Sequence, residues 1–184
     1  YEQPRGFAAI NLFQSDYTDF IENFYQIPGT TQYTYRNLNE VSIWGVELSG
    51  AWDVSDRTWI GYSASWQKGT QKAAAGTNET PHDLAPLTAS LSVGHELPQY
   101  DLSIEAVTTL AAAVKETASA TGYKPAGYGV LDVYGKWRLR QNAVLNFGVQ
   151  NVFDKRYFTA DAIGVTTTPS NSVAAASPLE LKTG

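Results

Sequence analysis

The side chains of this sequence that could perform chemistry are few and widely spaced. Cysteine is absent and only two histidines occur, so thiolate chemistry and Cys/His metal clusters are excluded. His82, in the segment TPHDLAP, could ligate haem iron or a metal ion through a neutral ring nitrogen, although a single loop histidine is more often solvated. The acidic residues Asp16, Asp19 and Glu22 lack the dense spacing of a calcium loop. No metal site is therefore expected.

Two glycine-containing segments resemble catalytic motifs only superficially. Residues 61–65 (GYSAS) lack the second glycine of a nucleophile elbow, and residues 127–129 (GYG) lack the third glycine of a dinucleotide-binding loop. Both segments also have the alternation of strands, where neither motif belongs. The sequence therefore predicts a protein that is not an enzyme and has no intrinsic cofactor.

A polar segment at residues 25–40 contains the best candidates for ligand contact. Tyr33, Tyr35 and Arg36 combine aromatic rings with a cation, a combination that suits a flat ligand or a protein surface. The same side chains could equally pack the segment against its neighbours. Together with His82, these three residues are the candidate ligand-binding set.

The elements that must position these residues show a period of two. Over residues 129–139, large apolar residues and glycine occupy the odd positions, while Asp, Tyr, Lys and Arg fall on even positions. This pattern indicates a strand and not an amphipathic helix. The alternation recurs in residues 44–52, 60–67, 87–94 and 145–150, and less regularly in 7–24 and 100–114. Roughly seven strands are expected, each close to the 9 to 11 residues that cross a bilayer.

The connections between these strands alternate in length. Short connections lie at residues 53–57, 96–99 and 140–142, and long polar ones at roughly 25–40, 68–85, 115–127 and 154–183. In an up-and-down meander, all short turns lie at one end and all long loops at the other, which is the layout of outer-membrane barrels. A soluble β-sandwich would show the same alternation along its strands, so alternation by itself does not distinguish the two.

Aromatic spacing and charge favour the membrane. Trp44 and Trp52 share one face and are separated by about 26 Å of strand, which when tilted is comparable to the roughly 25 Å apolar band between aromatic girdles. Charged residues make up only 17% of the chain, and no run of apolar residues is long enough for a transmembrane helix. The net charge of -5 without a basic block argues against nucleic acid as a partner.

Several motifs in order resemble those of TonB-dependent outer-membrane receptors. The pattern N-x-F-D-x-x-Y is present as Asn151, Phe153, Asp154 and Tyr157, and a G-x-E strand is present with Gly45 and Glu47. The segments LAPLTASLSVG (84–94) and PAGYGVLDVYGKW (125–137) are also similar to this family, and the haem and haemoglobin receptor branch is the most similar. In this setting the six motif residues are expected to be structural. Residues 151–158 are expected to form a hinge between wall and loop, in which Asn151 and Asp154 cap turning backbone.

The resemblance implies an all-β fold, an antiparallel transmembrane β-barrel of about 22 strands closed by a plug. Residues 1–184 are then expected to be the C-terminal portion of the barrel, without the final strand and without the plug domain. The chain also lacks methionine, as expected of part of a longer protein.

The implied function is active uptake of haem, free or from a haem-carrying protein, across the bacterial outer membrane. The implied partners are the haem or its carrier, membrane lipid, and the TonB complex acting through a plug segment outside this sequence. Haem-ligating residues are expected outside it as well. A ferric-siderophore receptor, a passive porin and a soluble β-sandwich remain alternatives.

Overall fold

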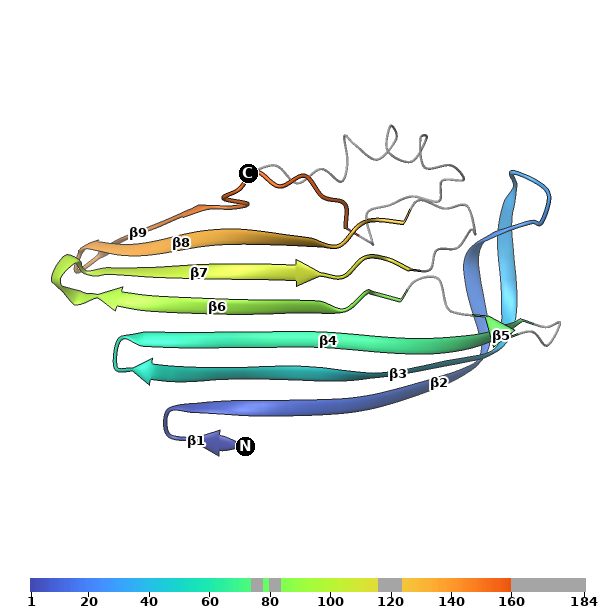
Figure 1. Ribbon diagram of the computed structural model, residues 1–184, viewed down its shortest axis with the longest axis horizontal. Helices are drawn as coiled ribbons and strands as arrows, with labels where there is room; N and C mark the ends of the chain where they lie inside the picture. The colour runs from blue at the N-terminus through green and yellow to red at the C-terminus, as the bar shows by residue number, and fades with distance from the viewer. Residues whose placement is uncertain (74–77, 80–83, 116–123, 160–184) are drawn as a thin grey trace.

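The computed structural model describes residues 1–73, 78–79, 84–115 and 124–159. These residues form one antiparallel sheet in which the long strands follow one another in chain order (Figure 1). The strands are β1 (Glu2–Gln3), β2 (Gly6–Gln26), β3 (Tyr33–Ser55), β4 (Thr58–Ala73), β5 (Asn78–Glu79), β6 (Thr88–Leu97), β7 (Leu102–Ala111), β8 (Tyr128–Arg140) and β9 (Ala143–Val149). The short strand β5 pairs only with β4. No helix among the described residues is long and apolar enough to cross a membrane.

The expected meander is confirmed, as are its short turns. Asp56 and Arg57 connect β3 to β4, the 3-10 turn η1 (Pro98–Tyr100) connects β6 to β7, and Gln141 and Asn142 connect β8 to β9. All three turns lie at the same end of the sheet (Figure 1). The chain thus returns through short turns at one end and longer connections at the other, as in a barrel wall.

The expected loop at residues 25–40 is wrong, because most of it is strand. β2 has 21 residues and β3 has 23, about twice the number needed to cross a bilayer. The true connection is residues 27–32, where Gly29 has a φ of 77° that favours glycine. The cross-strand ladder continues through a register shift between Glu22 and Tyr25. We call residues 17–41 the outer hairpin; it bends away from the rest of the sheet (Figure 1).

The register aligns side chains of one kind across the strands. In the row Leu12, Val46 and Trp66, each residue is the direct neighbour of the next. Because side chains alternate between faces, this row shares its face with other apolar residues. That apolar face includes Ile10, Leu48, Tyr62, Leu91, Val93, Ile104, Leu110, Leu131, Val133, Trp137 and Phe147. The opposite, polar face includes Asn11, Glu47, Ser63, Ser65, Ser90, Thr109, Asp132, Lys136 and Asn146.

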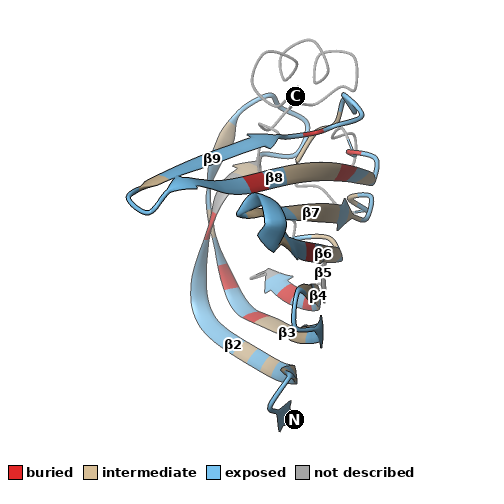
Figure 2. Cartoon of the chain, turned by 90° about the vertical axis from the view of Figure 1, so that its left-hand side faces the viewer, coloured by how far each residue is buried: buried red, intermediate tan, exposed pale blue. Residues whose placement is uncertain are grey.

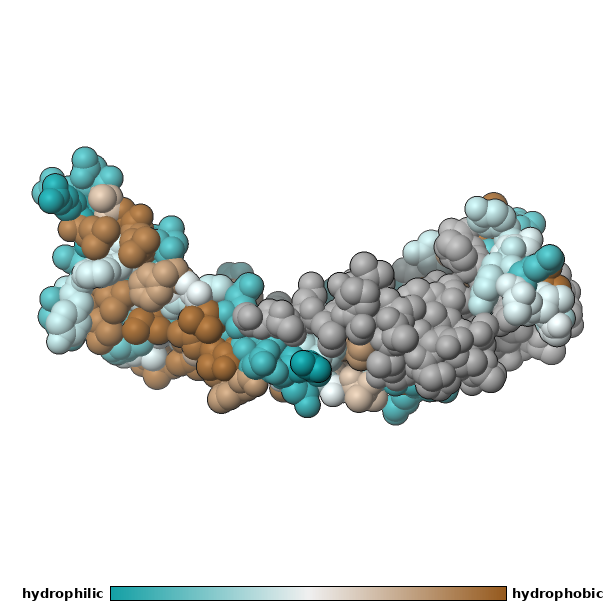
Figure 3. Space-filling model, turned by 90° about the horizontal axis from the view of Figure 1, so that it is seen from above, coloured by the Kyte–Doolittle hydropathy of each residue, from teal (hydrophilic) through white to brown (hydrophobic). Residues whose placement is uncertain are grey.

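The sheet is a single curved layer and has almost no core (Figure 2). The buried apolar residues of the described chain are Leu38, Val41 and Val130, and the first two pack together at the base of the outer hairpin. By contrast, Ile10 and Leu12 are more than 70% exposed. In the view of Figure 3, hydrophobic surface gathers towards the end of the sheet with the short turns, and the opposite end is mostly hydrophilic. Such a layer needs lipid on its apolar face, because exposed apolar patches of this size are rare on soluble monomers.

Glycine and a large side chain face each other repeatedly across neighbouring strands. Direct cross-strand pairs of glycine with an aromatic residue are Gly6 with Trp52, Gly45 with Phe13, Gly50 with Tyr62, Gly94 with Trp59, Gly135 with Phe147 and Gly148 with Tyr134. At each of these glycines an added Cβ would approach an atom of the partner ring to 2.8 Å or less. Each ring therefore lies over the glycine opposite, the arrangement known as aromatic rescue.

Candidate ligand-facing site

The G-x-E motif lies on the polar face in the middle of β3. Gly45 is buried, and a Cβ there would lie 2.6 Å from Phe13 Cζ and 2.6 Å from the backbone oxygen of Trp66. Two residues further on, Glu47 accepts a hydrogen bond of 3.0 Å from Asn11 Nδ2 on β2. The motif thus places a flat ring and a carboxylate–amide pair side by side on the surface expected to face the lumen.

The apolar face ends in an aromatic pair below the outer hairpin. Trp44 and Trp66 meet edge to face with ring centroids 5.0 Å apart. Beyond them the neighbouring positions become charged, and Lys72 forms an exposed ion pair with Glu40. This change from indole rings to charges marks a membrane–water interface. The outer hairpin therefore extends beyond the membrane on the side of the long connections.

The outer hairpin is held by a buried ion pair between its two strands. Arg36 Nε donates to Glu22 Oε2 at 2.7 Å, and Arg36 Nη2 lies 2.6 Å from the same oxygen. The side chains are only 15% and 11% exposed. The Arg36 guanidinium also lies 4.0 Å from the centre of the Tyr25 ring, a cation–π contact. Arg36 thus has a packing role within the hairpin.

The structure places the other candidate ligand residues in different settings. Tyr35 is 75% exposed on the outer hairpin. The hydroxyl of Tyr33 is buried with no hydrogen-bond partner among the described residues. His82 lies outside the described residues, and so does the predicted tail after residue 159. The described part of the chain contains no cluster of three or more His, Asp or Glu side chains suited to a metal ion.

The N-x-F-D motif forms a tight turn directly after β9. Asn151 and Asp154 both have positive φ, 50° and 48°, a conformation that Asn and Asp tolerate better than other non-glycine residues. Asn151 Oδ1 accepts from Lys155 N at 2.9 Å, and Asn151 Nδ2 donates to Lys155 O at 3.0 Å. Asp132 on β8 accepts a bond of 2.6 Å from the backbone of Asn151. Asn151 is buried, whereas Phe153 is 77% exposed.

The tyrosine of the same motif anchors the segment after the turn. The ring of Tyr157 stacks on Tyr128 of β8, with centroids 4.2 Å apart and planes at 28°. Burial raises the pKa of the Tyr157 phenol above its usual value, and Tyr128 and the Asp132 carboxylate add to this. The motif residues therefore tie the chain to the end of β8.

Glu22 is the functional-site residue that the sequence did not assign. Its spacing from Arg36 carries no helical or metal signature. The signal becomes visible only with the hairpin register, in which Glu22 lies directly opposite Arg36. The position of the connection alone would not predict the pair, because without the register shift between Glu22 and Tyr25 regular pairing places Glu22 opposite Asn37.

Comparison with known proteins finds a matching family model and similar proteins. A family model described as "TonB dependent receptor-like, beta-barrel" matches residues 1–152. A hemoglobin and hemoglobin-haptoglobin-binding protein of Haemophilus ducreyi is 28% identical over 88% of this chain and 21% of its own length. The hemoglobin-haptoglobin utilization protein B of Neisseria meningitidis serogroup C is 22% identical over 86% of this chain and 24% of its own length. The chain thus spans about a quarter or less of these relatives.

A solved structure shows the same fold. The copper transporter OprC superimposes with a TM-score of 0.75 over 87% of this chain and 25% of its own chain, at 21% sequence identity. At this identity the likeness concerns the fold, in which the sheet described above is one part of a larger barrel wall.

Proposed function

The chain belongs to the TonB-dependent receptor family, a family of bacterial outer-membrane proteins, and from this premise we propose that it serves the uptake of haem from haem-carrying proteins. Two relatives whose names include hemoglobin binding or utilization support this choice of ligand. In this proposal the polar face lines the lumen, and the outer hairpin meets the carrier protein. Energy comes from the TonB complex acting on a plug segment that is not among these residues.

The observation that carries the proposal is the length and stiffness of the outer hairpin. β2 and β3 continue well past the Trp44–Trp66 pair, and the Glu22–Arg36 ion pair holds their far ends together. A preordered hairpin loses little conformational entropy on binding, and it offers a protein-sized ligand a surface above the headgroups. A small chelate entering the lumen has no need of such a projection.

Tyr35 is the side chain that we assign to carrier contact. It is highly exposed, and tyrosine is enriched at the centres of protein interfaces. Tyr33 and Arg36 instead help to hold the hairpin that carries Tyr35, because the Tyr33 hydroxyl is buried and Arg36 is paired within the hairpin. His82 remains a candidate ligand residue on its sequence context only.

Growth and binding assays with the complete receptor test the proposal. A strain deleted for the receptor and complemented with the wild-type gene is expected to grow with haemoglobin as sole iron source. Tyr35→Ala should weaken haemoglobin binding to whole cells about 30-fold, the effect of losing an interface hot spot of roughly 2 kcal/mol. Tyr100→Ala is the matched control, since Tyr100 is 63% exposed at the opposite end of the sheet.

Two results would contradict different parts of the proposal. If the deletion abolishes growth on a ferric siderophore and leaves growth on haemoglobin unchanged, the ligand is a siderophore. If haemoglobin supports growth and Tyr35→Ala binds it like the wild type, the ligand is correct but the outer hairpin is not its contact surface. Diffusion of small solutes without the TonB complex would instead indicate a passive porin.

A further inference from the structure

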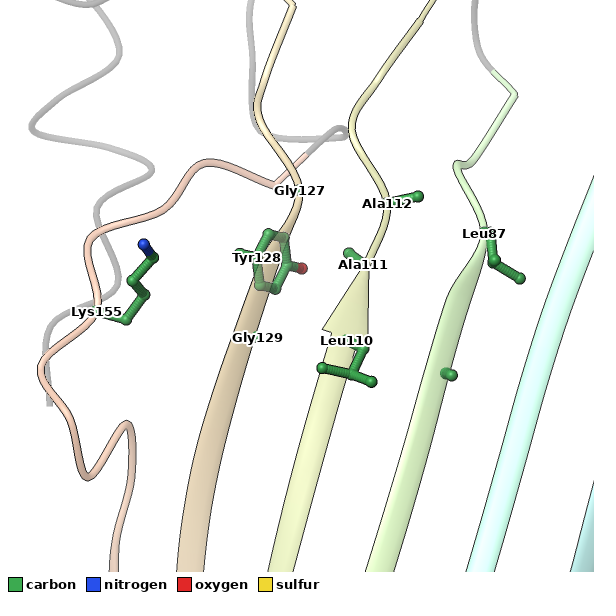
Figure 4. A pocket seen from close by; sticks show the side chains of 9 residues that line it. Leu87, Leu110, Ala111, Ala112, Gly127, Tyr128, Gly129 and Lys155 are labelled. Carbon is green, nitrogen blue, oxygen red and sulfur yellow. The ribbon is translucent and has the colours of Figure 1, made fainter.

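A groove of about 660 Å³ lies at the outer ends of β6, β7 and β8 (Figure 4). Most of the strand residues that line it belong to the apolar face, whereas Ala111 and Tyr128 belong to the polar face. Part of its floor is the row Ala89, Leu110 and Gly129, which are direct neighbours across the three strands. The next row outward is formed by Leu87, Ala112 and Gly127, and the backbone N–H of Ala112 donates to the carbonyl of Leu87 at 2.8 Å. The volume is within the range of roughly 300 to 1,000 Å³ that is common for ligand pockets.

Small residues at the outer ends of two strands make this groove possible. A Cβ at Gly127 would lie 2.8 Å from the backbone oxygen of Ala111, so the two chain segments are in close contact. At Gly129 a Cβ would lie 2.9 Å from Leu110 Cδ2, because the leucine leans over the glycine. The aromatic residue of the lining is Tyr128, whose ring stacks on that of Tyr157.

One cation lines this groove, and three more lie within three residues of its lining residues in the chain. Lys155 lines it directly (Figure 4), and Arg156 follows in the chain. Lys115 and Lys124 come from the connections after β7 and before β8, and the bond of 3.0 Å from Val114 N to Pro125 O holds these two connections together. None of the four cations has an ion-pair partner among the described residues, in contrast to the paired Arg5, Arg36 and Lys72.

We propose that this groove binds a phosphorylated lipid of the outer leaflet. An acyl chain occupies the apolar floor, and the phosphate of the headgroup is held by Lys155 with Lys115, Lys124 and Arg156. The floor of the groove belongs to the apolar face that lipid covers, so an acyl chain reaches it without crossing water. Cations near a membrane surface attract anionic headgroups, and a cation next to an apolar groove selects a ligand with both an anionic and an apolar part.

The complete receptor, purified in neutral detergent and stripped of lipid, allows a direct test. The probes are lipid A, which is a phosphorylated and multiply acylated disaccharide, its dephosphorylated form, zwitterionic phosphatidylcholine and inorganic phosphate. Bound lipid is counted by native mass spectrometry. Lipid A is expected to bind with much higher affinity than the other three probes. Each cation removed should weaken it about fivefold, the equivalent of roughly 1 kcal/mol per charge.

Variants that change either charge or shape test the cations and the apolar floor of the groove separately. Lys155→Gln should weaken lipid A binding about fivefold, and combining it with Lys115→Gln and Lys124→Gln should weaken binding on the order of a hundredfold. Lys155→Arg keeps the charge and should bind like the wild type. Ala89→Phe fills the floor and should lower affinity for lipid A without changing any charge. Arg140→Gln removes a cation at the opposite end of the sheet and should have no effect.

The binding measurements can either support or overturn the proposed lipid site. Equal binding of lipid A by the triple variant and the wild type would overturn the proposal, as would equal binding of the phosphorylated and dephosphorylated probes. Binding of inorganic phosphate that competes with lipid A and is insensitive to Ala89→Phe would show a simple anion site and reject the lipid. Heat-resistant migration in detergent gels checks that every variant is a folded barrel. A protein that covers the groove would appear as an additional mass that lipid A does not displace.

Discussion

Replacing Glu22 by glutamine should loosen the outer hairpin and leave the barrel wall intact. The substitution keeps the size of the side chain and removes its charge, so the Arg36 guanidinium loses its carboxylate while remaining mostly buried. Leaving one partner of a fully buried pair uncompensated costs about 3–5 kcal/mol, whereas exposed pairs contribute about 0–1 kcal/mol. The exposed fractions of 11% and 15% place this pair nearer to the buried limit.

The retained contacts reduce the expected cost. The glutamine amide oxygen still accepts one hydrogen bond, and the stacking of Arg36 on Tyr25 persists, contributing about 0.5–1 kcal/mol. We therefore expect about 2 kcal/mol of lost local stability, which corresponds to a roughly 30-fold increase in hairpin opening. Because the hairpin lies beyond the membrane-spanning part of the sheet, this opening should be local and not global.

Hydrogen exchange of the complete receptor in detergent or nanodiscs measures this effect. Amides of residues 20–38 should exchange about 30-fold faster in Glu22→Gln, and those of β6 to β8 should be unchanged. Glu40→Gln is the matched control, because it removes the same charge from an exposed pair with Lys72 on the same hairpin and should change protection by less than about 1 kcal/mol. Equal protection in the two variants would refute the reasoning, since burial would then not matter.

Three further predictions concern the wall and its last turn. Gly45→Val should reduce the amount of folded receptor to a small fraction of the wild-type amount in heat-modifiability gels. The valine Cβ would collide with Phe13 and with the backbone oxygen of Trp66. Normal assembly of this variant would contradict the close packing. Asn151→Ala should destabilise the barrel by about 1–3 kcal/mol in urea unfolding, because two hydrogen bonds and a favourable residue at φ 50° are lost. Asn151→Gly should recover only the part of this stability that comes from the positive φ, since glycine makes neither side-chain hydrogen bond. The Tyr157 phenol should ionise at higher pH than free tyrosine in ultraviolet titration, since burial raises its pKa. The raised pKa means that the neutral form is favoured in the fold, so its contribution is present below the usual tyrosine pKa and is lost as pH rises through the folded value.

The wall was predictable from the sequence because one physical constraint dominates it. Wherever lipid covers one face and a polar lumen the other, side chains must alternate, and the segments around Val46, Leu91 and Val133 all do so. The short turns were predictable for the same reason, since they simply separate two alternating segments. The family motifs then identified the barrel, because Gly45 and Asn151 each have a backbone or packing role that few other residues could fill.

The outer hairpin was not predictable in this way. Above the membrane neither face is covered by lipid, so the alternation fades and polar residues occur on both sides of β2 and β3. The register shift between Glu22 and Tyr25 also disrupts the period of two. Its strands are held by cross-strand pairs such as Glu22 with Arg36, which depend on the partner strand and not on local sequence. The groove next to Lys155 likewise needs three strands and a distant turn, so no single segment indicates it.

The rings that lie over glycines on the polar face limit how far that face projects from the sheet. Phe13, Trp59 and Tyr134 are each opposite a glycine on the adjacent strand, and each ring comes within 2.8 Å of where that glycine's Cβ would be. A ring that rests on the neighbouring strand takes up width along the wall and little depth into the barrel. Replacing the glycine would force the ring to stand upright, so the height of the polar face depends on residues that have no side chain.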